Sequence, residues 1–145
     1  MTVVSRDIDA PADAVFAVLA DGWTYASWVV GASRIRQVED RFPEPGARIH
    51  HSVGTWPMLI DDTTSVLACE PGRRLELLVR AWPAGEGYVG LTLHPHGETT
   101  RVEMEERAVS GPAALIPRPV QALTLKARNR EALRRLAYLA EGRAS

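Results

Sequence analysis

A single cysteine, Cys69, occurs among the 145 residues of the sequence. One thiol cannot form an internal disulfide, and it cannot supply a multi-cysteine zinc or iron–sulfur site. The chain also lacks any run near the roughly 20 apolar residues that a membrane-spanning helix needs. Its first residues lack the basic and apolar segments of a secretory signal. These absences predict a cytoplasmic protein with no integral membrane segment.

Neither sign of charge is in excess, because 17 Lys and Arg residues stand against 18 Asp and Glu residues. Nucleic-acid binding usually requires a basic excess that meets the phosphates, so we expect no nucleic-acid partner. Lysine itself is almost missing, with Lys126 the only one. We interpret the preference for arginine as the coding bias of a GC-rich bacterial genome rather than as a requirement for anion binding.

The sequence does contain enough apolar residues for a folded core. It is 46% hydrophobic and 24% charged, which excludes a disordered chain. Its length falls within the usual size of one compact domain, so we expect residues 1–145 to form a single domain.

The N-terminal part predicts one strand and two short helices. Residues 3–9 alternate as a strand does. The predicted helix 11–20 begins with Pro11, whose missing N–H has no helical partner in the first turn anyway, and Asp13 meets the positive end of the helix dipole. A second helical turn follows an Asp-Gly break and ends near Gly31.

From residue 33 to residue 110, runs rich in valine, leucine, isoleucine and threonine alternate with proline and glycine clusters. Such punctuation predicts strands joined by sequential turns, which form an antiparallel meander. The six predicted strands are 33–42, 47–54, 58–69, 73–82, 86–94 and 98–109.

Residues 112–118 hold two prolines, a third follows at position 119, and the segment is expected to form a loop or an irregular helix start. Residues 119–142 then predict one long helix, because apolar residues recur at spacings of three and four. The stripe consists of Ala122, Leu125, Asn129, Ala132, Leu133, Leu136, Leu139 and Ala140.

These elements predict an α+β fold. A seven-stranded antiparallel sheet must bury one face, and the terminal helix is the only large apolar element that can cover it. We therefore expect the sheet to curve around the helix, with the two short helices closing one end. A single row of helix side chains cannot fill such a concave surface, so a cavity is expected between sheet and helix.

Four segments resemble the START-like superfamily of polyketide cyclases and dehydrases, often called SRPBCC. They are Ile8–Leu19, Trp28–Gly31, Glu70–Leu75 and Arg128–Leu136. The resemblance covers nearly the whole chain and implies a helix-grip fold with an internal pocket for a hydrophobic or amphipathic small molecule. It implies no universal catalytic set, because members include lipid and hormone binders as well as aromatase/cyclases.

Strand alternation turns three ionisable residues toward the expected cavity: His51, Asp62 and Glu106. A histidine and a desolvated carboxylate suit proton transfer beside a carbonyl or to a leaving hydroxyl. The alternatives are a pocket lining that only hydrogen-bonds a ligand, and a solvated rim. The positions predicted to face inward are Ile49, His51, Val53, Ile60, Asp62, Thr64, Val66, Ala68, Val102, Met104, Glu106 and Ala108.

We expect neither a metal nor a cofactor. Adjacent residues His50 and His51 point to opposite faces of a strand, and we place His94 and His96 in a turn around a proline without a nearby acid. No zinc pattern, phosphate-binding loop or serine elbow is present. Cys69 has no activating neighbour and is expected to be inert.

Four tryptophans, at positions 23, 28, 56 and 82, are many for so short a chain, and such rings suit pocket mouths. The alternative is that Trp23 and Trp28 pack the short helices onto the sheet. The predicted ligand-binding residues are Trp28, His51, Val53, Trp56, Asp62, Thr64, Trp82, Leu91, Met104, Glu106 and Leu125.

Three functions follow. The first is binding of a small lipid-, polyketide- or aromatic-like ligand by a monomer or homodimer. The second is a cofactor-free polyketide cyclase, aromatase or dehydrase that uses the same cavity. The third is a protein-interaction module with a vestigial pocket. The arginine-rich outer face of the last helix is a solvated surface or a contact for a partner or an anionic membrane.

Overall fold

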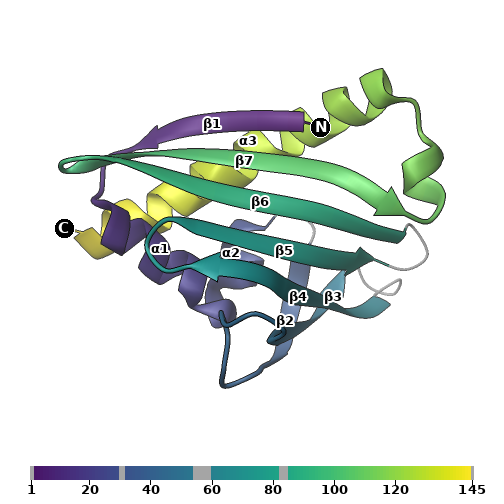
Figure 1. The fold of residues 1–145 in the computed structure, drawn as a ribbon, viewed down its shortest axis with the longest axis horizontal. Coiled ribbons are helices and arrows are strands. Elements are labelled where there is room, and N and C mark those ends of the chain that lie inside the picture. The colour runs from purple at the N-terminus through teal and green to yellow at the C-terminus, as the bar shows by residue number, and fades with distance from the viewer. Residues whose placement is uncertain (1, 30–31, 54–59, 82–84, 145) are drawn as a thin grey trace.

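The computed structural model describes residues 2–29, 32–53, 60–81 and 85–144. The N-terminal strand leads into two short helices, then a run of six strands, and finally one long helix (Figure 1). The elements are β1 (Thr2–Ile8), α1 (Ala12–Ala20), η1 (Gly22–Thr24), α2 (Tyr25–Trp28), β2 (Ala32–Val38), β3 (Arg48–Val53), β4 (Ile60–Glu70), β5 (Arg74–Ala81), β6 (Gly85–His96), β7 (Thr99–Ser110), η2 (Pro112–Leu115) and α3 (Arg118–Ala144).

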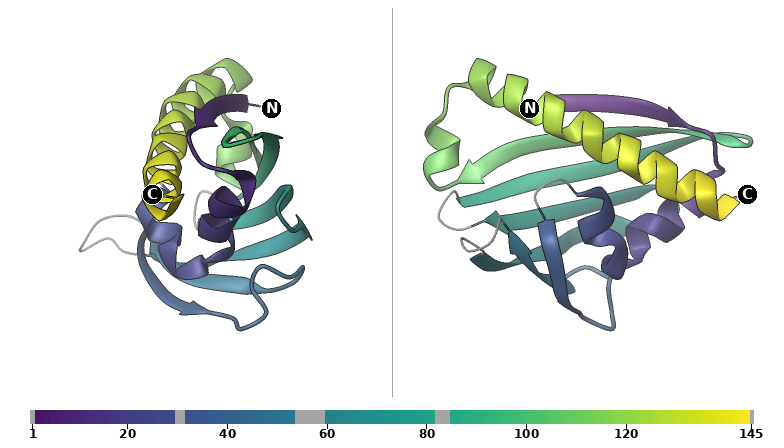
Figure 2. Two further views of the ribbon diagram at one scale, coloured as in Figure 1. Left: turned by 90° about the vertical axis from the view of Figure 1, so that its left-hand side faces the viewer. Right: turned by 180° about the vertical axis from the view of Figure 1, so that it is seen from behind.

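The described strands form one antiparallel sheet of seven in the order β1-β7-β6-β5-β4-β3-β2. The sheet curves, and α3 crosses its concave side while α1 and α2 close one end (Figure 2). This arrangement confirms the predicted helix-grip α+β fold. The meander order means that each new strand pairs with the one before it, and β1 joins the sheet beside β7.

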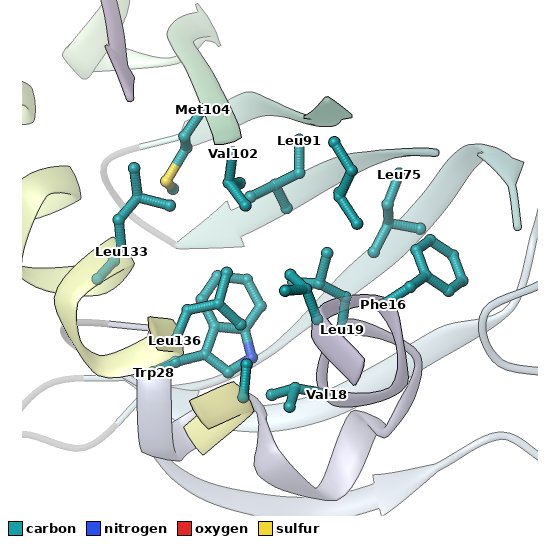
Figure 3. Close-up of a cluster of buried hydrophobic side chains, with 14 of the residues drawn as sticks. Phe16, Val18, Leu19, Trp28, Leu75, Leu91, Val102, Met104, Leu133 and Leu136 are labelled. Carbon is teal, nitrogen blue, oxygen red and sulfur yellow. The ribbon is translucent and has the colours of Figure 1, made fainter. Parts of the chain in front are cut away.

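The core lies between the concave face of the sheet and the helices (Figure 3). Inward positions of β5, β6 and β7 meet the buried stripe of α3 and the apolar face of α1, as alternation and helical periodicity require. The core residues that are at most 2% exposed include Ile8, Val15, Val18, Trp28, Leu75, Leu77, Leu91, Leu93, Val102, Leu133 and Leu136.

Two strand predictions are wrong in their bounds. The strand predicted over 33–42 ends at Val38, because residues 39–46 fold into consecutive turns with hydrogen bonds such as Phe42 N to Glu39 O. The turn predicted at His94–His96 is also absent, since β6 runs to His96 and reverses at Gly97, where φ is +65°. Pro95 fits there because β6 extends beyond its pairing with β5, so the missing N–H breaks no ladder on that side.

The predicted inward position of Ala68 is wrong as well. A β-bulge between Val66 and Ala68 shifts the register, so Ala68 pairs with Glu76 on the outer face and Cys69 comes opposite the inward Leu75. On the opposite edge of β4, the backbone of Val66 bonds to Gly46 and Ala47, in the turn before β3.

Candidate functional site

A cavity of about 240 Å³ lies between the sheet and the N-terminal half of α3. Its walls come from β5, β6 and β7 on one side and from residues 116–128 on the other. The lining residues are Val79, Gly85, Glu86, Gly87, Val89, Glu106, Arg107, Ala108, Ile116, Val120, Gln121, Thr124, Leu125 and Arg128.

Small side chains keep this end of the interior open. Gly87 shares the inward face of β6 with Val89, and a Cβ at Gly87 would meet only the Arg107 carbonyl oxygen, at 3.6 Å. Towards the other end of α3, Leu133 and Leu136 are fully buried and fill the corresponding space. The sheet is therefore packed tightly against one half of α3 and leaves room beside the other half.

An ion pair stands in the wall of this cavity. The guanidinium of Arg128, on α3, donates a hydrogen bond to a carboxylate oxygen of Glu106, on β7. The Glu106 side chain is 10% exposed and the Arg128 side chain 43%, so the carboxylate is buried while the cation reaches solvent. The lining also contains six apolar residues and two glycines, together with the polar or charged residues Glu86, Arg107, Gln121 and Thr124.

A second polar group is buried deeper, where α2 meets β3 and β4. The hydroxyl groups of Tyr25 and Thr64 are hydrogen-bonded at 2.9 Å, and Thr64 Oγ1 also bonds to Nε2 of His51 at 2.8 Å. The rings of Tyr25 and His51 stack with centroids 5.6 Å apart, and Trp28 meets Tyr25 edge to face at 5.7 Å. This polar cluster of Tyr25, His51 and Thr64 adjoins the cavity, because Thr64 pairs across β4 and β5 with the lining residue Val79.

Burial sets the protonation of the polar cluster. Desolvation is the main reason that the pKa of Tyr25 is raised to about 12; the Glu106 carboxylate adds to the rise, whereas the Thr64 hydrogen bond and the Arg128 cation oppose it. Desolvation also lowers the pKa of His51, against the opposing charge of Asp62. Both rings are therefore neutral at pH 7. No described residue offers a hydrogen-bond partner to Nδ1 of His51, although that atom is buried.

Asp62 lies beside the polar cluster but is held by other groups. It faces His51 across the β3–β4 register. Its Oδ1 accepts a hydrogen bond from the Thr63 N–H at 2.9 Å and lies 3.6 Å from Nε of Arg80. Among the described residues, no hydrogen bond joins Glu106 to His51 or to Asp62. The three ionisable residues selected from the sequence thus divide between the cavity wall and the polar cluster.

The other predicted ligand-binding residues fall into separate regions. Leu125 lines the cavity with Glu106. Trp28, Leu91 and Met104 belong to the hydrophobic core. Trp56, Trp82 and the side chain of Val53 lie outside what the structure describes. Of the remaining tryptophans, Trp23 is 60% exposed and does not pack onto the sheet. Within the described residues, no group of three His, Cys, Asp or Glu side chains is placed to hold a metal ion.

Sequence reasoning missed Tyr25, Gly87 and Arg128. Arg128 follows Leu125 by three residues, so it borders the inward stripe of α3, and this spacing could have placed it at the cavity. Tyr25 lies in the short turn that carries Trp28, where the sequence shows no repeating pattern. A cavity-facing glycine in a strand gives no signal of its own.

Solved structures with this architecture include proteins of known and unknown role. The chain is 15% identical to protein NE0264 from Nitrosomonas europaea, with a TM-score of 0.74 over 97% of this chain and 93% of that one. It is 18% identical to the Zhui aromatase/cyclase from Streptomyces sp. R1128, with a TM-score of 0.70 over 99% and 94%. It matches 52% of the di-domain aromatase/cyclase StfQ from the steffimycin biosynthetic pathway, at 17% identity and a TM-score of 0.69 over 99% of this chain.

Identities this low show a common fold and nothing finer. A comparison with curated proteins finds no match. Residues 2–141 do match the family model described as polyketide cyclase / dehydrase and lipid transport, in accord with the resemblance noted in the sequence. The chain therefore belongs to the polyketide cyclase / dehydrase and lipid transport family.

Proposed function

We propose that this protein binds a small amphipathic molecule, with an apolar or aromatic body and one polar end, in the cavity between β5–β7 and α3. The observation that carries the proposal is the cavity itself, which combines apolar side chains such as Val79, Val89 and Leu125 with polar groups that include the ion pair of Glu106 and Arg128. An apolar cleft with a few fixed polar groups is the usual form of a small-molecule site. An open cavity also argues against a vestigial pocket.

The size of the cavity favours a compact ligand. Its volume of about 240 Å³ is just below the roughly 300–1,000 Å³ of sites for drug-sized molecules. A molecule of one or two rings suits this space better than a long acyl chain does. Its body would contact Val79, Val89 and Leu125, which removes apolar surface of both partners from water.

The ion pair favours a ligand with an oxygen-bearing polar end. The guanidinium of Arg128 has five N–H donors in a fixed plane, and a single hydrogen bond joins it to Glu106. The remaining donors suit a carbonyl, phenol or carboxylate oxygen, and bonds from a cation are stronger than neutral ones. Glu106 accepts hydrogen bonds and so suits a hydroxyl group on the same ligand.

Thermal denaturation with a panel of naphthols, hydroxy-naphthoquinones and short fatty acids tests the proposal. A ligand that binds only the folded state stabilises it by about 2.7 kcal/mol at a hundredfold excess over Kd. Leu125→Trp fills the cavity and should abolish the shift in Tm. Leu123→Trp is the matched control, because Leu123 lies on the same helix but is 76% exposed. A panel without any shift, or an equal shift in both variants, would overturn the proposal.

A second candidate is a cofactor-free cyclase, aromatase or dehydrase that acts on the ligand of this cavity. The polar cluster is the observation that favours it, because neutral His51 is a competent base and the Tyr25 hydroxyl, with its pKa raised to about 12, stays a donor. His51 would remove a proton from a carbon beside a carbonyl, and Tyr25 would donate a hydrogen bond to the developing enolate oxygen.

Turnover of a poly-β-carbonyl substrate by purified protein tests this candidate. His51→Ala should then abolish turnover while a product-like ligand still raises Tm. Glu106→Gln tests the cavity carboxylate as an acid or base in the same assay. Retained turnover in both variants would remove these residues as catalytic groups.

A further inference from the structure

The first turns of α3 and the segment before them expose large apolar side chains. Leu115 is 86% exposed and Leu123 76%, and Ile116 and Val120 are also exposed. These four residues, here called the apolar tip, lie where α3 begins and extends past the edge of the sheet (Figure 1). Scattered exposed leucines are ordinary, but a contiguous group of this kind marks an interaction surface.

The apolar tip also borders the cavity. Ile116 and Val120 are both exposed to solvent and part of the cavity lining. An apolar ligand that enters between β6 and α3 therefore passes this surface. A surface or partner that contacts the apolar tip would therefore lie at the entrance of the cavity.

Positive charge continues from the apolar tip along α3. The helix carries seven Arg and Lys residues against two Glu residues, an excess of five positive charges, although the whole chain has a net charge of −1. The rest of the chain therefore carries an excess of six negative charges. Such asymmetry orients a protein in the field of a charged surface.

Leu123, Lys126, Arg130 and Arg134 follow each other at spacings of three and four, so they share one face of α3. All four are exposed. Glu131 pairs with Arg134 and Arg135 and reduces their charge. Lys126 and Arg130 form no ion pair with any residue in the described ranges, so their charge is available next to the apolar tip.

We propose that the apolar tip, together with Lys126 and Arg130, docks this protein on an anionic lipid surface. Apolar side chains that project from a basic helix enter the boundary between headgroups and acyl chains, and the cations meet the anionic headgroups. A partner with a purely acidic, polar surface would match the charge but would give the projecting leucines no apolar environment. No helix in the described part of the chain is long and apolar enough to span a bilayer, so the contact is peripheral.

Co-sedimentation with vesicles tests the proposal. The wild-type protein should bind phosphatidylcholine vesicles that contain phosphatidylglycerol, bind pure phosphatidylcholine at least about tenfold more weakly, and dissociate at high salt. Each basic residue near the surface contributes about a fivefold change in affinity, so Lys126→Glu/Arg130→Glu should weaken binding more than about 25-fold. Leu115→Gln/Leu123→Gln should weaken it by at least about tenfold.

Two control variants make the same kinds of substitution at positions outside the proposed docking surface. Arg41→Glu/Arg73→Glu alters the net charge by the same amount at exposed positions outside α3, and Val3→Gln/Leu67→Gln removes two half-exposed apolar side chains from strands. Both controls should bind vesicles like the wild type. None of the eight residues lines the cavity, so the ligand-induced shift in Tm should persist in all four variants, which separates this proposal from the proposed function.

Three results would overturn the docking proposal. The first is a wild-type protein that does not sediment with anionic vesicles. The second is an equal loss of binding in the control variants. The third is full vesicle binding by Leu115→Gln/Leu123→Gln together with loss in the charge-reversed variant, because a purely electrostatic surface fits an acidic protein instead.

Discussion

Glu106 on β7 and Arg128 on α3 form an ion pair that joins the sheet to the terminal helix at the wall of the cavity. The carboxylate is buried, and the guanidinium is its cationic partner. Loss of the cation leaves a buried negative charge without compensation, whereas loss of both charges leaves an apolar wall. Loss of the cation alone should therefore destabilise the folded protein more than loss of both charges.

Arg128→Met should therefore lower the free energy of unfolding by about 1–3 kcal/mol, less than for a fully buried pair because Arg128 reaches solvent. Glu106→Gln/Arg128→Met should recover at least half of that loss. Urea denaturation at pH 7 measures both. If Arg128→Met costs nothing, the ion pair does not stabilise the junction of β7 and α3.

Gly87 and Gly90 lie on opposite faces of β6, so we expect a valine at each position to have opposite effects on stability and on ligand affinity. At Gly87 the new side chain points into open space, so Gly87→Val should change stability by less than about 1 kcal/mol and reduce ligand affinity at least tenfold. At Gly90 a Cβ would lie 2.8 Å from the Tyr88 hydroxyl and 2.9 Å from a guanidinium nitrogen of Arg74.

Gly90→Val should therefore destabilise the protein by about 1–2 kcal/mol, because Tyr88 and Arg74 must give up the hydrogen bonds that join them to each other and to Glu76. Ligand affinity should stay unchanged. Chemical denaturation and calorimetric titration of both variants measure the contrast. A Gly87→Val protein that binds ligand normally would contradict the assigned cavity.

The raised pKa of the Tyr25 hydroxyl predicts a loss of stability at high pH. Its pKa is raised from 10.0 in the unfolded chain to about 12, mainly by burial. Between these two pH values the folded protein keeps the Tyr25 proton, whereas the unfolded chain releases it. The contribution of Tyr25 to the free energy of unfolding is therefore complete below pH 10 and is lost as the pH rises towards 12, by up to about 1.4 kcal/mol per pH unit. Tyr25→Phe should reduce this slope in denaturation series. An identical slope in the variant would contradict the buried phenol.

The lowered pKa of His51 predicts that stability also falls at acidic pH, where the dependence on pH has the opposite sign. Burial lowers its pKa in the folded protein below the usual histidine value of 6.5. As the pH falls, the unfolded chain binds a proton at His51 that the folded protein excludes. The contribution of neutral His51 to the free energy of unfolding is therefore complete above pH 6.5 and declines as the pH falls through the folded pKa. His51→Gln should decline less over the same range. NMR titration of the imidazole gives the folded pKa directly, and a value above 6.5 would contradict the assignment.

The element order and the fold class were readable from the sequence because they depend on strong local signals. Turn residues mark the strand ends, and the period of the terminal stripe from Asn129 to Ala140 marks the buried face of α3. The inward positions of His51, Thr64 and Glu106 also followed from alternation alone, and all three are buried. Local periodicity therefore determined the face that these three residues occupy.

Features that depend on contacts distant in sequence could not be read in this way. The bulge after Val66 appears only in the pairing of β4 with β5. The pairing of Glu106 with Arg128 requires the crossing position of α3, and the stacking of Tyr25 on His51 requires the docking of α2. Alternation places a side chain on a face, but the tertiary packing decides its partner.

Methyl NMR with a bound ligand tests the central claim most directly. A naphthol or hydroxy-naphthoquinone that raises Tm is added to protein with labelled methyl groups, and contacts between ligand and methyl protons are recorded. Ligand binding in the cavity predicts contacts to the methyl groups of Val79, Val89, Ala108 and Leu125, which share the lining. Contacts confined to exposed methyl groups such as those of Val3 and Leu67, with none to the lining, would contradict it.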